Sequence, residues 1–411
     1  MSQKHDYHRM LEQCEKNSEI IGELIDNFLV PYVIARENLY REFQNTASRY
    51  RDVIRKMPEG WEGFSMTQYA CLKLFKRDGL AAKYINHSAL KTRSAEEIAF
   101  MKFQIDHPWR FSFFRVKPLP EAFFFTLTDV FTGEAFTVYS KGIDSILKAK
   151  GSLSMLLLLI GFNGLCWQTY GPLAHFIGIQ PFDIFYFATL LDAGVKHYED
   201  VPELIEGNPL HFMVLYCGAE LPSVISRGHS LIYCKSELKK IDLDPEKLSC
   251  KALVRKVQHI YKITLPDTED FPHYGACYYH SKKRHLVVTA TTESAYTMMA
   301  ELMGEHGVSV PMRPRIFITP GMISILRKDL KMNIDYTGPY EKTFAGPEPD
   351  KEEKAFLKKI NAVMRDVVEA SNAKRPVDAA ALAHRHDVEI ETVNQLIESV
   401  ENTLKNIPGS E

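Results

Sequence analysis

Apolar residues recur every three to four positions through the first hundred residues, which is the spacing of one face of a helix. One such stripe includes Leu24, Phe28, Leu39 and Phe43, and Pro31 interrupts it. Proline has no N–H and a fixed φ, so it fits the first turn of a helix better than the interior. The pattern therefore predicts two helices, or one kinked helix, that pack within the chain or against an identical copy.

Further helical patterns follow this stripe. The spacing of apolar residues predicts one helix over 67–84 and another over 94–104. Ser94 and Glu97 have the spacing of a capping box, in which each side chain bonds the backbone N–H of the other residue. Pro108 then ends the pattern, and we assign residues 1–109 to a helical region.

From residue 110 the pattern changes to short runs of aromatic and β-branched residues, which predict strands. Three runs cover 111–116, 123–128 and 135–139. A fourth and a fifth flank Asn163-Gly164, a pair that supplies the positive φ angles of a type I′ hairpin turn. Such strands predict a small antiparallel β module over 110–180, closed like a barrel so that it exposes no strand edge.

The apolar run Leu156–Ile160 lies directly before that turn and would otherwise suggest a membrane segment. It is much shorter than the roughly 18 apolar residues that a membrane-spanning helix needs. We therefore expect a buried strand and no association with a membrane.

Residues 181–330 alternate between helical and extended patterns and predict an α+β domain. Within it, the apolar run 210–216 suggests a buried strand, and 273–290 suggests a hairpin with a polar turn. Thr291 or Thr292 can cap the helix that follows. That helix carries a stripe of methionine, leucine and alanine, which we expect to pack on its own sheet rather than to form an adaptable binding groove.

Glycine and proline are frequent in 331–353, which predicts a linker. Residues 354–411 predict a helix followed by a pair of helices that resembles a helix-turn-helix. From Val377 onward, seven acidic residues face two basic residues, a net charge of −5. This charge has the wrong sign for attraction to DNA phosphates, so we favour a protein contact by this tail over a DNA contact. The apolar residues expected to form that contact surface are Val393, Leu396 and Ile397.

The charge of the whole chain favours no particular partner. Fifty Lys and Arg against 52 Asp and Glu leave a net charge of −2, so no global field attracts nucleic acid or an anionic membrane. The seven cysteines are scattered and include no Cys-x-x-Cys pair, which predicts neither a disulfide framework nor a zinc ribbon. The polar amino terminus has no signal-peptide pattern. We expect a cytoplasmic protein with no cofactor and no bound metal.

Residues 111–178 contain the turn Asp129-Val-Phe-Thr-Gly133 and end on Tyr170-Gly-Pro172. In these features they resemble a β module of poorly characterised bacterial proteins that also carry a SEC-C metal-binding tail. The resemblance covers under a fifth of the chain. This sequence has no cysteine cluster at its carboxyl end, so the resemblance implies the β module and no metal site.

The search for chemistry yields one candidate surface. The chain has no P-loop, no Gly-x-Ser-x-Gly, no His-Glu-x-x-His and no Gly-x-Gly-x-x-Gly. Basic residues from two segments would form a contact patch if those segments meet in the fold, and otherwise they are solvated turns. The members of this basic patch are Lys282, Lys283, Arg284, Arg313 and Arg315.

The sequence thus predicts a multi-domain α+β protein that binds or scaffolds another macromolecule, with a protein partner or a second copy favoured. Two alternatives stay open. A nucleic-acid-associated regulator would use the helix-turn-helix-like tail. An enzyme, which we favour less, would have an unfamiliar site between the β module and the 181–330 domain, because domain interfaces are common places for pockets.

Overall fold

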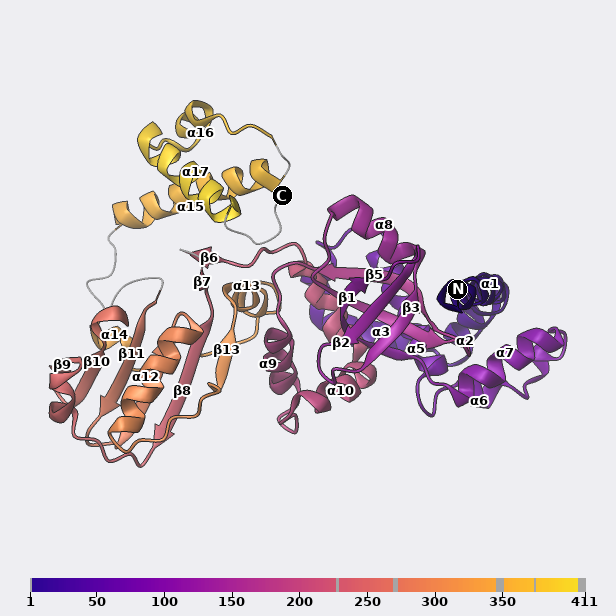
Figure 1. The fold of residues 1–411 in the computed structure, drawn as a ribbon, viewed down its shortest axis with the longest axis horizontal. Coiled ribbons are helices and arrows are strands. Elements are labelled where there is room, and N and C mark those ends of the chain that lie inside the picture. The colour runs from indigo at the N-terminus through magenta and orange to yellow at the C-terminus, as the bar shows by residue number, and fades with distance from the viewer. Residues whose placement is uncertain (1, 227–228, 269–272, 345–350, 373–374, 406–411) are drawn as a thin grey trace. The chain divides into compact units, whose positions relative to one another are not determined.

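The computed structural model describes residues 2–226, 229–268, 273–344, 351–372 and 375–405, and it confirms the predicted α+β class (Figure 1). The chain divides into two compact units. The first comprises residues 1–223 and 318–334, and the second comprises 224–317 and 335–411. The first unit thus joins the predicted helical region, the predicted β module and the beginning of the predicted 181–330 domain.

The first unit begins with consecutive helical segments: α1 (Ser2–Ile20), η1 (Ile21–Leu29) and α2 (Val30–Arg36). η1 is a π-helix, in which the N–H of Val30 bonds the carbonyl of Ile25, five residues earlier. Pro31 lies in the first turn of α2, as predicted. Because Pro31 donates no hydrogen bond, the turn before it is free to widen into the π pattern. Leu24 and Phe43 of the apolar stripe are buried inside the chain, which confirms that the stripe packs within it.

Shorter helices follow this segment. They are α3 (Leu39–Ala47), η2 (Ser48–Tyr50), α4 (Arg51–Ile54), α5 (Trp61–Phe75), α6 (Ala81–Tyr84), η3 (Ser88–Leu90) and α7 (Ala95–Asp106). The prediction of one helix over 67–84 is wrong, because the chain turns back after α5. A Cβ at Gly79 would lie 2.4 Å from the carbonyl oxygen of Leu74, so only glycine fits this turn. The capping box of Ser94 and Glu97 is confirmed at the start of α7.

Residues 110–176 form a closed barrel with the strand order β1-β2-β3-β5-β4. Its strands are β1 (Arg110–Pro118), β2 (Phe124–Asp129), β3 (Ala135–Tyr139), β4 (Met155–Phe162) and β5 (Trp167–Phe176), as the sequence predicts. β3 pairs with β5 in parallel, so the prediction of an antiparallel module is wrong for this one pair of strands. This pairing is possible because α8 (Lys141–Lys150), which we did not predict, carries the chain from β3 to β4. A five-stranded barrel with this order and this helix is an OB-fold.

The interior of the barrel is filled by alternate residues of its strands, and Ile143 of α8 joins them. Leu156, Leu158 and Ile160 are fully buried there, which confirms the predicted buried strand. The hairpin between β4 and β5 is also confirmed, but its predicted type I′ turn is wrong. Gly164 has a positive φ of 95° whereas Asn163 does not, because the Asn163 side chain accepts hydrogen bonds from the N–H groups of Leu165 and Cys166 instead.

The remaining helical segments of the first unit are α9 (Pro181–Leu191), η4 (Tyr198–Asp200), α10 (Val201–Gly207), α11 (Pro209–Met213), η5 (Val214–Gly218), α13 (Pro320–Ser324) and η8 (Ile325–Asp329). The predicted strand over 210–216 is wrong, since this run forms α11 and η5. Almost every residue in the run is apolar, so no period distinguishes a strand from a helix. Pro209 sits in the first turn of α11, a position that favours the helix.

The second unit contains a sheet with the order β13-β8-β12-β11-β10-β9. Its strands are β8 (Tyr233–Lys239), β9 (Leu253–Val257), β10 (Ile260–Thr264), β11 (Gly275–His280), β12 (His285–Ala290) and β13 (Ile316–Ile318). A separate pair, β6 (Ile225–Ser226) with β7 (His229–Ser230), and the turns η6 (Pro245–Cys250) and η7 (Pro266–Thr268) complete this part.

One helix, α12 (Glu293–Glu305), covers one face of this sheet. β11 and β12 confirm the hairpin predicted over 273–290. Thr292 caps α12 by accepting a hydrogen bond from the N–H of Ala295, also as predicted. Met299 and Met303 are fully buried in the core between helix and sheet, so the methionine stripe packs on its own sheet.

The carboxyl-terminal helices are α14 (Glu341–Phe344), α15 (Lys351–Asn372), α16 (Ala379–His386) and α17 (Ile390–Lys405). Residues 345–350 of the predicted linker lie outside the described residues. α15, α16 and α17 pack around a core of their own that includes Val363, Val367 and Val393. Asp387 turns the chain between α16 and α17 with a positive φ of 50°.

Candidate functional site

The ligand-binding surface of an OB-fold lies across the second and third strands and the adjoining loops. In this protein, α1 covers that surface. Tyr7 and Cys14 of α1 pack with Phe124 of β2 and Tyr139 of β3. Rings covered in this way are not available to stack on nucleic-acid bases. The concave surfaces of the first unit described below lie elsewhere.

A cavity of about 710 Å³ lies between η1, α2, α5 and β5, and we call it the η1 cavity. Its walls are mainly apolar and aromatic. The residues that line it are Ile21, Ile25, Asp26, Val30, Pro31, Ile34, Phe64, Thr67, Cys71, Trp109, Tyr170, Gly171 and Pro172. This size and this composition are typical of ligand pockets.

The aromatic wall of the η1 cavity is a stack of three rings. Trp109 lies between Phe75 and Tyr170, at centroid distances of 4.5 and 4.1 Å. The indole N–H of Trp109 donates to Gln104 at 2.7 Å, which fixes the ring in place. The buried hydroxyl of Tyr170 has no hydrogen-bond partner within the described part of the chain. The wall is therefore rigid and almost entirely apolar.

A β-bulge in β5 shapes the opposite side of this cavity. Leu157 of β4 pairs with Ala174 and Leu159 pairs with Tyr170, so three residues of β5 stand opposite one residue of β4. The first of them, Gly171, has a positive φ of 69°, and the next is Pro172. Bulges redirect side chains and are common beside functional sites, and proline is tolerated in strands at such positions.

Asp26 of η1 is the only charged residue among the described residues that line the η1 cavity. It lies at the exposed rim, and partial burial raises the pKa of its carboxyl group. Desolvation disfavours the carboxylate, so a cation that binds beside Asp26 would stabilise the ionised form. The cavity thus favours an apolar ligand that carries a positive charge.

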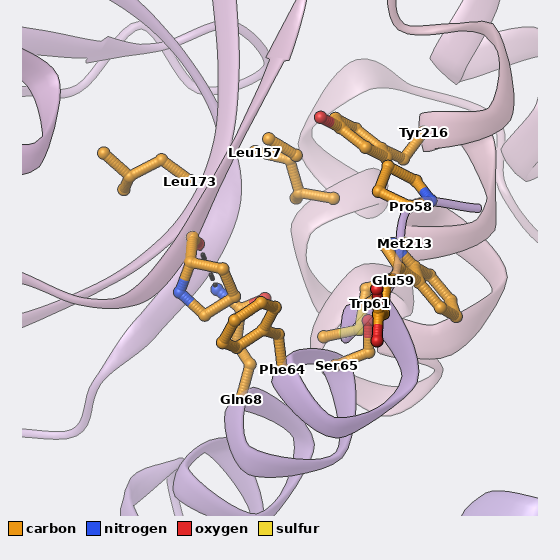
Figure 2. Close-up of a pocket in the computed structure, with 12 residues that line it drawn as sticks. Pro58, Glu59, Trp61, Phe64, Ser65, Gln68, Leu157, Leu173, Met213 and Tyr216 are labelled. Carbon is orange, nitrogen blue, oxygen red and sulfur yellow. Dashed lines mark hydrogen bonds between the residues drawn. The ribbon is translucent and has the colours of Figure 1, made fainter. Parts of the chain in front are cut away.

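A second cavity of about 190 Å³, which we call the β5 cavity, shares lining residues with the first. Figure 2 shows the residues that line the β5 cavity. α5 contributes Phe64 and Gln68, and Leu157 and Leu173 come from β4 and β5. The side-chain amide of Gln68 donates to the carbonyl of Pro172 at 3.1 Å, which fastens α5 to the bulge. The other lining residues are Pro58, Glu59, Trp61, Ser65, Pro172, Ala174, Met213 and Tyr216.

Phe64 and Pro172 line both cavities, so the two form one groove, which we call the Phe64 groove. The Phe64 side chain is 58% exposed although it is large and apolar. Gly60, with a φ of 82°, lies beneath it, and a Cβ at Gly60 would approach the Phe64 ring to 3.2 Å. The absence of a side chain at Gly60 therefore lets the ring rest on the backbone, where it is presented at the edge of the groove.

A more polar hollow of about 550 Å³ continues the surface beyond Glu59. It is lined by Arg51, Arg55 and Glu62, among others. Within the Phe64 groove itself, the described lining residues include no histidine, lysine or arginine. Burial and the nearby Asp26 raise the pKa of the Cys71 thiol, so it is a poor nucleophile. Asp26 and Glu59 are thus the charged groups among the described residues that line the groove.

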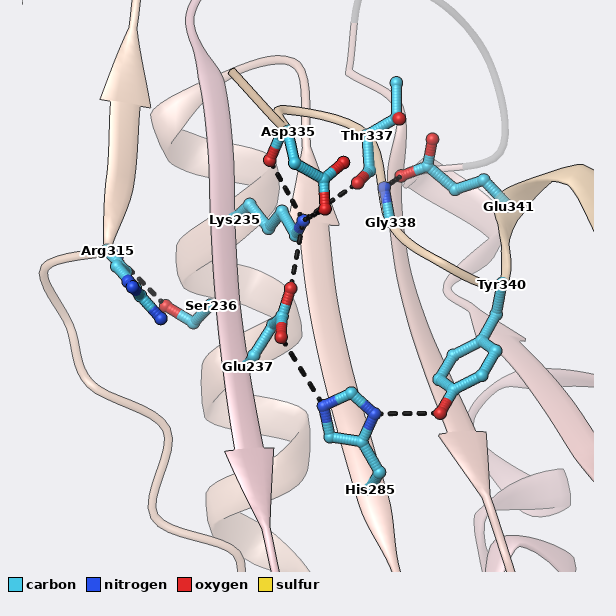
Figure 3. Close-up of polar contacts among 10 residues, drawn as sticks. All are labelled: Lys235, Ser236, Glu237, His285, Arg315, Asp335, Thr337, Gly338, Tyr340 and Glu341. Carbon is cyan, nitrogen blue, oxygen red and sulfur yellow. Dashed lines mark hydrogen bonds and ion pairs between the residues drawn. The ribbon is translucent and has the colours of Figure 1, made fainter. Parts of the chain in front are cut away.

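The second unit has a polar cluster on its sheet (Figure 3). The Lys235 side chain on β8 is 4% exposed, and its ammonium group lies 3.0 Å from Glu237 and 3.3 Å from the carboxylate of Asp335. It also donates to the carbonyls of Asp335 and Thr337, at 3.1 and 2.8 Å. These four acceptors engage all three N–H groups of the ammonium group. Lys235 therefore holds the segment 335–337 on the sheet and is not free to act as a base.

His285 of β12 extends this cluster towards α14. Its Nδ1 lies 2.8 Å from the hydroxyl of Tyr340, and its Nε2 lies 3.6 Å from the Glu237 carboxylate. Burial lowers the pKa of His285, so the ring is neutral at neutral pH. Glu341 accepts a hydrogen bond from the N–H of Gly338 at 2.9 Å. These contacts all hold 335–341 on the sheet, which is a structural role.

The two segments of the predicted basic patch lie at different points along one sheet. Lys282, Lys283 and Arg284 lie in the turn between β11 and β12, and the Arg284 guanidinium pairs with Asp242 at 3.4 Å. The backbone N–H of Arg315 lies 3.4 Å from the Ser236 hydroxyl, beside the middle of β8. Arg313 is exposed, two residues before Arg315. Lys239 of β8 pairs with His285, the first residue after the β11–β12 turn. Ser236, and with it Arg315, lies three residues further from this turn along β8.

The predicted contact surface of the tail lies largely inside the carboxyl-terminal core. Val393 is fully buried, and Leu396 and Ile397 are partly buried against the same cluster. The spacing of these apolar residues along α17 allows the three helices to pack on one another. Asp366 of α15 adds a polar link, since it pairs with Arg385 at 3.0 Å and with His386 at 2.8 Å.

The sequence reading missed the Phe64 groove, although two local signals point to it. Trp61 and Phe64 follow the turn Pro58-Glu-Gly60 at a spacing that places both on one side of a helix. Gly171-Pro172 inside a strand pattern is a signal for a bulge. Neither signal reveals that the two segments meet.

No protein-family model matches the chain, and a search of curated proteins finds no match either. Within the described ranges, no group of three or more His, Cys, Asp or Glu residues is placed to hold a metal ion. The same residues contain no helix of the length and apolar character that crossing a membrane requires. The functional conclusion therefore rests on the geometry of the chain itself.

Proposed function

We propose that this chain is a binding protein whose Phe64 groove takes up an apolar segment of a protein partner that carries a basic residue. The observation that carries this proposal is that Asp26 is the only charged residue among the described residues that line a large, mainly apolar cavity. A single carboxylate among apolar walls matches a cation attached to an apolar body.

Phe64 supports the proposal on the apolar side. Complete burial of the part of its side chain that is now exposed would contribute roughly 1–2 kcal/mol. Solvent-exposed aromatic residues beside a pocket are typical anchors of protein interfaces. The η1 cavity can then accept the neighbouring apolar side chains of the partner.

Charge favours a protein segment over nucleic acid at this groove. Asp26 and Glu59 are the only charged residues among its described lining residues, and both are acidic. Phosphates would be repelled, whereas Lys or Arg of a partner would be attracted. Partial burial raises the pKa of Asp26, so the affinity for a basic segment should fall as the pH drops through the titration range of Asp26.

The test is a titration of the full chain with two matched peptide probes, one an apolar segment ending in lysine and the other the same segment ending in glutamate. Trp61 and Trp109 line the groove and report binding by their fluorescence. We expect saturable binding of the lysine peptide only. Phe64→Ser should weaken it about tenfold, the equivalent of about 1.4 kcal/mol. Asp26→Asn should weaken it by a few-fold, as for an exposed ion pair.

Tyr40→Ser provides the matched control, because Tyr40 is similarly exposed, at 55%, and does not line the groove. Equal binding of both peptides, or equal loss in the Phe64 and Tyr40 variants, would refute the proposal. Concentration-dependent light scattering that Phe64→Ser abolishes would instead assign the groove to a second copy of this chain.

A further inference from the structure

Two cysteines from distant parts of the sequence meet at the barrel. The Sγ atom of Cys14, on α1, lies 3.4 Å from the Sγ atom of Cys166, which precedes β5, and the residues are 152 positions apart. Both thiols are free and buried. In a disulfide the two sulfur atoms are about 2.05 Å apart. Side-chain rotations that bring the two Sγ atoms closer by a little over an ångström would therefore allow the bond to form.

Polar groups surround this pair on an otherwise apolar surface. The side-chain amide of Asn163 donates to Cys14 at 3.2 Å and contacts the sulfur of Cys166 at 3.6 Å. The amide of Gln168 donates to the carbonyl of Cys14 at 2.9 Å and to the hydroxyl of Ser18 at 3.0 Å. Two amide side chains of the barrel thus hold α1 in register, with one thiol directly opposite the other.

The two thiols differ in their environment. The hydrogen bond from Cys14 lowers the pKa of Cys166, burial opposes this shift, and the hydrogen bond from Asn163 adds to the lowering. The same hydrogen bond to Cys166, together with burial, raises the pKa of Cys14. An asymmetric pair of this kind suits attack by one sulfur and resolution by the other.

We propose that Cys14 and Cys166 are a redox pair that a hydroperoxide converts into a disulfide, locking α1 across the ligand face of the barrel. The thiolate of Cys166 attacks the peroxide, so that an S–O bond forms, the O–O bond breaks and hydroxide or alkoxide leaves. The leaving group takes the proton that Cys166 released on ionisation and becomes water or an alcohol. The sulfur of Cys14 then attacks Cys166, the S–O bond breaks, and the hydroxide takes the thiol proton of Cys14 to leave as water. Each cysteine loses one electron, and the peroxide gains two.

The consequence follows from what α1 covers. Phe124 and Tyr139 of the barrel lie beneath Tyr7 and Cys14. In the dithiol form α1 is held by noncovalent contacts and can lift by local opening. In the disulfide form, opening at Cys14 is blocked. Oxidation would therefore keep the OB-fold surface closed.

The experiment treats the full chain with hydrogen peroxide, alkylates the remaining thiols with N-ethylmaleimide and identifies linked peptides by mass spectrometry. We expect a Cys14–Cys166 link that dithiothreitol reverses, and faster migration on a non-reducing gel. Cys14→Ser and Cys166→Ser should each abolish the link, whereas Cys250→Ser, which removes an exposed thiol, should keep it.

The wild-type result decides the proposal even if a serine variant folds poorly. If Cys250 is oxidised while Cys14 and Cys166 are both alkylated after unfolding, the pair is ordinary core packing and the proposal is overturned. Hydrogen exchange tests the lock separately. Amides of α1 near Cys14 should exchange more slowly after oxidation, and unchanged exchange in the linked protein would refute the lock.

Discussion

The carboxylate of Asp183, near the start of α9, accepts hydrogen bonds from both the backbone N–H and the hydroxyl of Thr319, at 2.7 and 3.0 Å. Thr319 caps α13, so this pair fastens the segment 318–334 to the rest of the first unit. The N–H of Gln180 is a third donor, at 2.8 Å. Burial opposes these hydrogen bonds and raises the pKa of Asp183 to about 7.

We expect Asp183 to make the stability of the first unit depend on pH. A group whose pKa is raised by folding stabilises the folded state while it is protonated, and this contribution is lost as the pH rises through the folded pKa. The free energy of unfolding of the wild type, relative to Asp183→Asn, should therefore fall by a few kcal/mol between about pH 4 and about pH 7. Above that range it should stay level. Urea unfolding at a series of pH values measures this difference.

The control for the loss of a carboxylate is Asp52→Asn, because Asp52 is exposed on α4. If the difference in free energy of unfolding between the wild type and Asp183→Asn were constant from about pH 4 to about pH 8, the expectation would be contradicted.

The backbone conformation of Gly164, in the loop between β4 and β5, predicts that any side chain at this position would lower the free energy of unfolding. An added Cβ has room, since its nearest contact is the Phe103 ring at 3.7 Å, but the φ of 95° is strained for other residues. Gly164→Val should therefore lower the free energy of unfolding by about 1–3 kcal/mol. Gly63→Ala, within α5 where an added Cβ meets nothing, should be neutral or stabilising. Thermal unfolding would decide the matter, and equal effects of the two changes would rule out backbone strain.

The contacts of the Lys235 ammonium group predict that its removal would release the segment 335–341 from the sheet. Lys235→Met removes the ammonium group and leaves Glu237 and the Asp335 and Thr337 carbonyls without their common donor. We expect a loss of about 3 kcal/mol and faster hydrogen exchange in 335–341. Lys239→Met, on the exposed end of the same strand, is the matched control and should change little. Unchanged exchange in the Lys235 variant would show that other contacts hold the segment.

A titration with duplex DNA tests the regulator alternative for the carboxyl-terminal helices. Glu391 and Glu398 of α17 are exposed and acidic, so we expect no binding of labelled random duplex by the full chain at low salt. Fluorescence anisotropy measures this, and the double variant Glu391→Lys with Glu398→Lys should gain affinity as a positive control. Binding of the wild type at about micromolar concentration, weakened by salt and lost in Arg375→Glu, would favour the regulator.

Local patterns explain why the barrel could be predicted. β1, β2 and β3 are short runs rich in aromatic and β-branched residues, and this signal depends only on near neighbours. α8 also carried a signal that we did not use, because Ile143 and Leu147 stand four residues apart after the capping Ser140. The run over 210–216 carried none, since it is apolar on every side.

The candidate sites depended on contacts that no local pattern contains. Asp26 becomes a lining residue because a π-helix and a strand bulge meet at α5. Cys14 and Cys166 meet because α1 lies on the barrel. In the sequence each of these cysteines stands alone, and a lone cysteine indicates neither a partner nor a reactivity.

The interruption of the second unit by residues 318–334 has a consequence for synthesis. The chain passes between the units three times, at 223–224, 317–318 and 334–335. During translation, Asp183 emerges well before Thr319, so the first unit cannot be completed until most strands of the second unit have already left the ribosome. The first unit is nevertheless complete before the second, because residues 335–411 of the second unit are synthesised last. A gene fragment that ends between residues 223 and 318 would yield a first unit whose buried Asp183 lacks both of the donors that Thr319 supplies.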